Sequence, residues 1–257
     1  MAGGASLAQA AARKLVDELG ISDPAELDVE LVAAHCGAYV TYRPLRSCEG
    51  HLLRTGDSAL IVVDAEARRH VGKWRFVIAH ELGHFLRHPQ LDQLKLCTKA
   101  ELSSWYRTSG YELEANHFAA ELLMPERLVA PLCDRNRPSL HDVEELTRQF
   151  RVSLSSAAIR FVGLSPEPCA VVMSTGGSIK WCIRTDDFGL RLERGYRVGR
   201  DTYAGDLFAG KKIDDGPQPL EAVGWTDDDR APGVELFEHS RHLPRYDSVL
   251  SFLWRAG

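Results

Sequence analysis

Residues 80–84 constrain this chain more than any other feature of its sequence. They read His-Glu-Leu-Gly-His and lie within an apolar stretch, 76–86, whose pattern predicts a buried helix. On a helix, His80 and His84 lie one turn apart on the same face, where both rings can bind a single metal ion. Burying these side chains without such a partner would be costly. The pattern therefore predicts a helix that carries part of a metal site.

Glu81 follows His80 directly, so its carboxylate lies beside the expected ion and not on it. From that position it can take a proton from a water molecule that the metal activates. Glu81 is therefore the predicted catalytic base. We expect Zn²⁺ as the ion, with Mn²⁺ as the alternative.

A catalytic zinc site needs a third protein ligand, and the residues after His84 lack the third histidine of the metzincin pattern. The best candidate is the helical stretch 112–124, which contains Glu112 and Glu114. These carboxylates point to nearly opposite sides, so only one can face the first helix.

Asn116 lies one turn after Glu112, and a zinc-bound histidine needs an acceptor for its free ring N–H. We therefore expect Glu112 to bind the metal and Asn116 to support a ligand histidine. Glu114 would pair with a nearby arginine or favour the helix start. The alternative is that both carboxylates only stabilise the helix N-terminus.

Together, residues 75–84 and 112–125 resemble the ImmA/IrrE family of metallopeptidases. The first segment reads Arg-Phe-x-x-Ala-His-Glu-Leu-Gly-His, and the second reads Glu-x-Glu-Ala-Asn-x-Phe-Ala-Ala-x-Leu-Leu-Met-Pro. The resemblance covers about residues 20–165. It implies a gluzincin-type zinc site and the proteolysis of helix-turn-helix repressors in phage, mobile-element or DNA-damage stress responses.

Periodicity and turn residues predict an α+β fold in two domains. The expected helices are 5–19, 28–37, 73–88, 112–124, 140–150 and 154–163, and the expected strands are 38–43, 50–55, 58–63, 169–174, 179–184, 234–237 and 248–254. A Pro-rich composition shift near residue 165 marks the boundary. We expect a zincin-like metallopeptidase domain over 1–165, including a helix-turn-helix-like segment at 139–163. A β-rich regulatory or docking domain follows over 166–257; IrrE-type relatives carry a GAF-like domain there, although no diagnostic residue matches it.

Charge and composition limit the expected partners. With 31 Lys and Arg against 36 Asp and Glu, the net charge is −5, so no global basic field favours nucleic acid. Acidic residues offset the arginines of segment 139–163 as well, so we expect no direct nucleic-acid binding. No apolar run approaches the roughly 20 residues of a membrane span, and no secretory signal is visible. Scattered cysteines without a paired motif favour a reducing cytoplasm. The expected partner is a protein substrate, and the sequence leaves the oligomeric state open.

Two other functions remain open at this point. The chain could be a non-catalytic regulator that contains a metal and binds a repressor or small ligand, or the protease of a toxin–antitoxin system. Glu81 favours catalysis, because a structural metal site needs no base.

Several finer expectations accompany this reading. A substrate peptide would pair along the strand at residues 60–63. Four side chains near the motif are expected to be structural, with stabilisation of an oxyanion as the alternative, and three later histidines are expected on the surface. The first set is His88, His117, Tyr106 and Tyr111, and the second is His141, His239 and His242.

Overall fold

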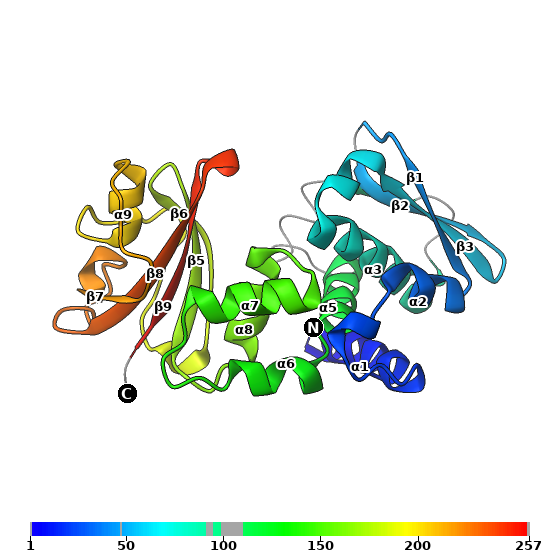
Figure 1. Cartoon of the computed structure of the whole chain (residues 1–257), viewed down its shortest axis with the longest axis horizontal. Coiled ribbons are helices and arrows are strands. Elements are labelled where there is room, and N and C mark those ends of the chain that lie inside the picture. The colour runs from blue at the N-terminus through cyan, green and yellow to red at the C-terminus, as the bar shows by residue number, and fades with distance from the viewer. Residues whose placement is uncertain (1, 47, 91–94, 99–109, 256–257) are drawn as a thin grey trace. The chain divides into compact units, whose positions relative to one another are not determined.

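The computed structural model describes residues 2–46, 48–90, 95–98 and 110–255. It divides into two compact units, each with helices and a sheet (Figure 1). The first unit comprises Met1–Leu128 and Arg148–Ser153, and the second comprises Val129–Thr147 and Leu154–Gly257. The predicted α+β fold class is confirmed.

The first unit has a four-stranded sheet and several helices. Its helices are α1 (Ala2–Glu18), α2 (Val29–His35), α3 (Val71–Arg87) and α5 (Tyr111–Leu123), and its strands are β1 (Ala38–Arg43), β2 (Cys48–Thr55), β3 (Ser58–Asp64) and β4 (Lys95–Thr98). Asp28 caps α2, because its carboxylate accepts the backbone N–H groups of Glu30 and Leu31. The turn at Gly56 and Asp57 joins β2 and β3 as an antiparallel hairpin.

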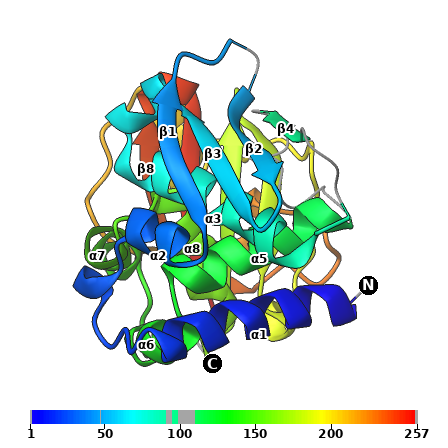
Figure 2. The same ribbon diagram turned by 90° about the vertical axis from the view of Figure 1, so that its right-hand side faces the viewer.

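Helix α3 is the central element of this unit. It contacts β2 and β3 as well as α5, and α1 lies along α5 (Figure 2). Two glycines permit this close packing. A Cβ atom on Gly83 would lie 3.2 Å from the ring of Phe118 on α5, and a Cβ atom on Gly50 of β2 would overlap Val77 of α3. Small residues at these two positions therefore set how closely β2 and α5 approach the helix.

The strand order corrects the expected peptide-binding edge. The order is β1-β3-β2-β4, with β1 parallel to β3 and the other pairs antiparallel. Residues 59–64 of β3 pair with β1, and residues 58–63 pair with β2. Both edges of β3 are thus occupied, and a substrate peptide cannot pair along residues 60–63. In this sheet, β1 and β4 are the outer strands.

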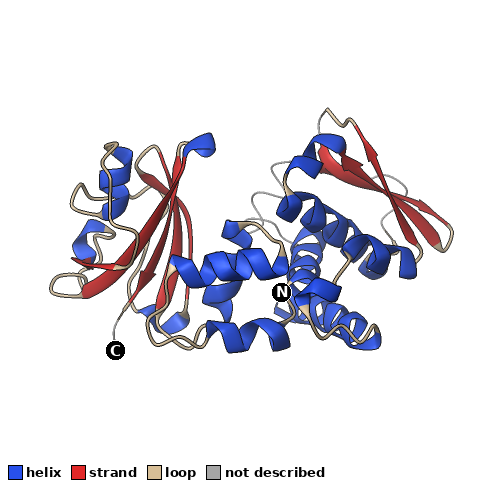
Figure 3. Ribbon diagram, viewed as in Figure 1, coloured by secondary structure: helices blue, strands red, loops and turns tan. Residues whose placement is uncertain are grey.

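The second unit is built on a five-stranded antiparallel sheet of order β6-β5-β9-β8-β7 (Figure 3). Its strands are β5 (Cys169–Thr175), β6 (Ser178–Arg184), β7 (Gln218–Glu221), β8 (Glu235–Leu243) and β9 (Ser248–Trp254); the helices are α6 (Glu126–Cys133), α7 (Leu140–Phe150), α8 (Leu154–Leu164) and α9 (Tyr203–Phe208). Every residue of the central strand β9 is buried. Trp181, Trp225 and Trp254 are also buried.

The helices before residue 165 make contacts with this second sheet. The ring of Phe161 on α8 packs edge-on against Phe252 of β9, with centroids 5.5 Å apart. The backbone N–H of Leu140, the first residue of α7, donates to Nδ1 of His239 on β8 at 3.2 Å. The two units thus divide the chain at other residues than the predicted domain boundary near 165, which rested on composition and stays a prediction.

Among the described helices, none is long and apolar enough to cross a membrane.

Candidate metal centre

Helices α3 and α5 bring the three predicted ligands together. Nε2 of His80 and Nε2 of His84 lie 3.1 Å apart. Glu112 of α5 places one carboxylate oxygen 3.2 Å from the first nitrogen and the other 3.2 Å from the second. All three residues are buried. We call His80, His84 and Glu112 the HExxH group, after the His-Glu-x-x-His motif at residues 80–84 that supplies its two histidines. Glu81, the glutamate of that motif, is not counted in the group.

The spacing of these atoms fits a tetrahedral metal ion. Ligand atoms held about 2.0–2.1 Å from zinc at tetrahedral angles lie roughly 3.3 Å from one another. The separations of 3.1 and 3.2 Å in the HExxH group are close to that value. Two imidazoles and a carboxylate are also the donor set of many catalytic zinc sites, which leave one position open.

Glu112 is held in its charged form. Burial by itself would raise the pKa of this carboxyl, but hydrogen bonds and charge from His80 and His84 outweigh the burial and hold the pKa well below its ordinary value. The buried site therefore places a carboxylate between two rings, as a metal site of this kind would need.

Asn116 lies where the sequence places it. Its Oδ1 is 2.9 Å from Nδ1 of His80, and the side chain is buried. Glu114 points elsewhere, toward Arg87, with 3.9 Å between Nη2 and Oε2. The predicted opposition of the two carboxylates on α5 is thus present in the structure.

Glu81 is fully buried and does not belong to the HExxH group, in which all ligand atoms lie within 4.8 Å of one another. Its carboxylate lies on the side of α3 that faces β2, where a Cβ atom on Gly50 would be 3.4 Å from Oε1. Gly50 was not predicted as part of the site. Gly50 lies within β2, and a glycine in a strand gives no signal of which side chains pack against it.

The contacts of His88 were not predicted from the sequence. Nδ1 of His84 lies 3.0 Å from Nδ1 of His88, and Nε2 of His88 lies 3.4 Å from Oε2 of Glu114. The ring of Tyr111 packs against His88, with centroids 4.7 Å apart. A signal was available, because His88 follows His84 at the same spacing of four that separates the two ligand histidines. Tyr106, one of the other neighbours considered, lies outside the described residues.

A second cluster of possible ligands occurs in the second unit. It consists of His141, Asp215 and His239, and we call it the second-unit group. His239 was expected on the surface but is buried, with 1% of its area exposed. The expectation failed because β8 is buried on both faces here and carries polar side chains on each, Glu238 and Ser240 on one face and His239 on the other, so apolar alternation does not mark its buried residues.

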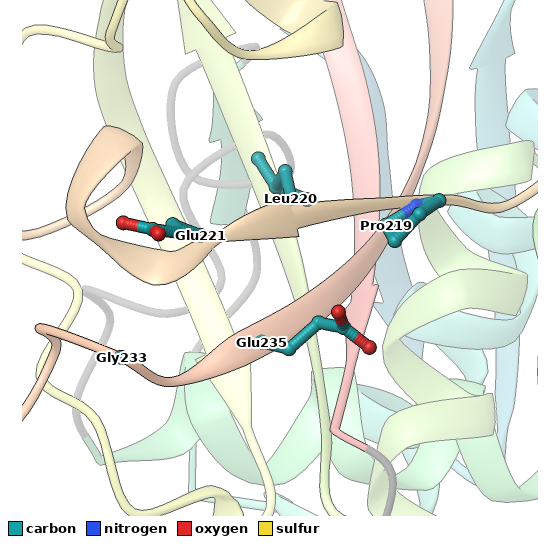
Figure 4. Close-up of a pocket in the computed structure, with 5 residues that line it drawn as sticks. All are labelled: Pro219, Leu220, Glu221, Gly233 and Glu235. Carbon is teal, nitrogen blue, oxygen red and sulfur yellow. The ribbon is translucent and has the colours of Figure 1, made fainter.

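A pocket of about 360 Å³ over β7 and the start of β8 is unlike the HExxH group (Figure 4). Its lining includes Glu221 and Glu235, whose side chains point in opposite directions. The lining contains no histidine or cysteine, and its carboxylates do not converge. This pocket therefore offers no comparable ligand set.

Comparison with known families decides which group this chain belongs to. The family model described as the IrrE N-terminal-like domain, a peptidase family, matches residues 33–162. The chain belongs to the ImmA/IrrE family. The matched segment of this ImmA/IrrE member contains all three residues of the HExxH group together with Glu81 and Asn116. Membership makes it a metallopeptidase-like protein with a possible His/Glu metal site.

Solved structures extend the similarity beyond the matched segment. A Mycobacterium tuberculosis transcriptional regulator aligns with a TM-score of 0.58 at 15% identity, over 96% of this ImmA/IrrE chain and 76% of the other. At that identity the likeness shows a shared fold. A comparison with curated proteins gives no match.

Proposed function

We propose that this chain is a zinc-dependent endopeptidase that cleaves a protein, and that the protein is a helix-turn-helix transcriptional repressor. The observation that carries the proposal is the HExxH group, in which the two Nε2 atoms lie 3.1 Å apart and each lies 3.2 Å from one oxygen of Glu112, together with the buried carboxylate of Glu81 on α3. Family membership supports peptide hydrolysis as the reaction.

His80, His84 and Glu112 would hold the ion. A zinc ion in such a site supplies Lewis acidity, which polarises a carbonyl and lowers the pKa of water to about 7. Imidazole ligands suit zinc better than manganese, whereas the single carboxylate is compatible with both. Zinc is therefore the ion that we propose, with manganese as the alternative that metal analysis distinguishes.

Glu81 would move the protons. Its carboxylate takes a proton from the attacking water, which adds to the scissile carbonyl carbon, and returns that proton to the leaving amine nitrogen as the C–N bond breaks. The burial of Glu81 against Gly50 holds the carboxylate on the β2 side of α3. Asn116 accepts the ring N–H of His80 and so keeps Nε2 of that ring free to bind the metal.

The choice of a repressor as substrate rests on the resemblance to the ImmA/IrrE family and on the kind of protein that shares this fold, a transcriptional regulator. The same likeness favours a second candidate, a regulator that binds a repressor without cutting it. The two candidates differ in what happens to the repressor chain.

The deciding experiment combines the zinc-loaded protein with a helix-turn-helix repressor encoded next to its gene. We expect the repressor to be cut at a defined peptide bond, seen by mass spectrometry as two complementary fragments, and we expect 1,10-phenanthroline to stop the reaction until zinc is restored. An intact repressor whose DNA binding changes in a stable complex would instead favour the regulator. A repressor that is neither cut nor bound would exclude this substrate class.

A further inference from the structure

The two histidines of the HExxH group have different partners at their outer ring nitrogens. Nδ1 of His80 faces an amide oxygen, that of Asn116, at 2.9 Å. Nδ1 of His84 faces another ring nitrogen, Nδ1 of His88, at 3.0 Å. His88 is buried, with 2% of its area exposed, and its other nitrogen lies 3.4 Å from Glu114. The second contact thus continues outward to a carboxylate.

The hydrogens of this chain of contacts follow from simple rules. A neutral histidine ring carries one N–H, on Nδ1 or on Nε2. His84 can bind an ion through Nε2, which faces Glu112, only if that nitrogen is bare, so its hydrogen lies on Nδ1. Two ring nitrogens form a hydrogen bond only when one of them is bare. His84 must therefore donate, and Nδ1 of His88 must accept.

The contact between His88 and Glu114 leads to the same assignment of the His88 hydrogen. An ionised carboxylate only accepts hydrogen bonds. The nitrogen of His88 that faces Glu114, Nε2, therefore carries the hydrogen, which leaves Nδ1 bare for His84. The two ends of the contact chain select the same tautomer of His88.

We propose that His88 and Glu114 are positioning residues that orient His84 for metal binding through a directed pair of hydrogen bonds. The inference rests on the proposed metal site and adds to it the parts that hold the second ligand. Partners of this kind fix the ring and increase the basicity of the ligand nitrogen. Since the pair ends in a carboxylate, His84 receives a charged acceptor system, whereas His80 receives a neutral amide.

The local structure holds His88 in place for this role. It is the residue after α3, and its backbone N–H donates to the carbonyl of His84 at 3.0 Å, so the two rings stay one turn apart. Tyr111, the first residue of α5, packs on the ring. Glu114 comes from α5 as well, so the contact chain links both helices that carry the ligands.

The test measures zinc affinity by competition with a chromogenic chelator in the full chain. We expect His88→Leu to bind zinc about 10- to 100-fold more weakly than the wild type. His88→Gln, whose side-chain oxygen can accept from His84, should recover most of that loss. His35→Leu, a change of the same kind at an exposed histidine of α2, should leave the affinity unchanged. Equal affinities for His88→Leu and the wild type would overturn the inference.

A second measurement needs no variant. In the zinc-loaded wild type, ¹⁵N chemical shifts of the His88 ring should show the hydrogen on Nε2. A hydrogen on Nδ1 would overturn the inference, because His84 could then no longer donate to it. If the wild type binds no zinc at all, the proposed metal site itself fails, and this outcome is distinct from zinc binding that does not depend on His88.

Discussion

Each unit of this chain gathers two histidines and a carboxylate, but only one of the two clusters is arranged as a metal site. In the HExxH group the two Nε2 atoms lie 3.1 Å apart, each lies 3.2 Å from one oxygen of Glu112, and all three residues are buried. In the second-unit group, Nε2 of His239 is 3.2 Å from Asp215, but that of His141 is 3.9 Å away, and His141 and Asp215 are exposed. Residue types alone do not distinguish the two clusters.

The two clusters differ in which ring nitrogen of their histidines carries the hydrogen. In the HExxH group, Asn116 faces Nδ1 of His80 and His88 faces Nδ1 of His84, so hydrogens on these two nitrogens leave each Nε2, the atom that faces Glu112, able to bind an ion. In the second-unit group, Nδ1 of His239 accepts the backbone N–H of Leu140, so Nε2 must carry the hydrogen that it donates to Asp215. Arg241 already supplies a cation to Asp215 at 3.1 Å. We therefore interpret the second-unit group as an ion-pair cluster that holds the start of α7 against β8.

The largest expected effect comes from removing a ligand of the HExxH group. Glu112→Ala should lose zinc completely, because the remaining two histidines form an incomplete site beside an unfilled buried space. Glu114→Ala should retain stoichiometric zinc, with an affinity reduced about 10-fold through His88. Metal analysis by mass spectrometry after dialysis measures both.

The matched control for this comparison is His141→Ala in the second-unit group. It should keep one zinc ion per chain. A wild type with two ions, one of which is lost in His141→Ala, would break the distinction between the clusters. Zinc retained by Glu112→Ala but lost by Glu114→Ala would reverse the assignment of the third ligand.

The next effect concerns activity without metal loss. Glu81→Gln should reduce cleavage by about 10²- to 10⁴-fold, the usual contribution of a general base, while zinc content and thermal stability stay the same. Glu66→Gln, at an exposed carboxylate in the short helix before α3, is the control and should be fully active. Simultaneous loss of zinc and activity in Glu81→Gln would mean that Glu81 is a ligand.

Much of the HExxH group could be predicted from the sequence because its constraints are local. The spacing of four between the histidines and the apolar surroundings predict α3. Asn116, a buried polar residue that needs a partner, predicts which side of α5 faces the two histidines, and its 2.9 Å contact with His80 agrees. Such arguments need only helix geometry and the cost of burying polar groups.

The missed features depend on long-range pairing. The strand 58–64 could be predicted from its residues, but its central place in the sheet could not, since neighbours in a sheet come from distant segments. Strand β4 pairs with β2, although β3 and α3 lie between the two strands in the sequence, and the residues of β4 show no clear periodic pattern. The burial of His239 was missed for the same reason, because its partners Leu140 and Asp215 are distant from it in the sequence.

A smaller effect should appear in the pH dependence of stability. Burial lowers the pKa of His239 below its ordinary value, and the hydrogen bond to Asp215 only partly opposes this, with His141 and Arg241 adding to the lowering. Between that lowered pKa and about 6.5, the unfolded chain takes up a proton that the folded chain does not. The stabilising contribution is therefore complete above about pH 6.5 and is lost as the pH falls.

Urea denaturation followed between pH 7.5 and 5.5 tests this expectation. His239→Gln should lose part of the fall in stability that the wild type shows on acidification, and His242→Gln, at an exposed histidine of the same strand, should keep it. Identical pH profiles for His239→Gln and the wild type would mean that protonation of His239 does not disturb its contact with Leu140.

The smallest expected effect tests the outer end of the contact chain from His84. A Cβ atom on Gly4 of α1 would lie 2.6 Å from Oε1 of Glu114, so Gly4→Ala should push that carboxylate away from His88. Because the displaced atom is the end of a flexible side chain, the fold should tolerate the change, and zinc affinity should fall by less than the roughly 10-fold lower limit for direct loss of such a partner. A Cβ atom on Gly163 of α8 would have no neighbouring atom within 4 Å, so Gly163→Ala is the control. Both substitutions favour the helix by removing a glycine, so a lower zinc affinity confined to Gly4→Ala would have to come from Glu114. Equal affinities in the two variants would show that His84 keeps its orientation without a fixed carboxylate behind His88, and the distinction between the two ligand histidines would then end at His88.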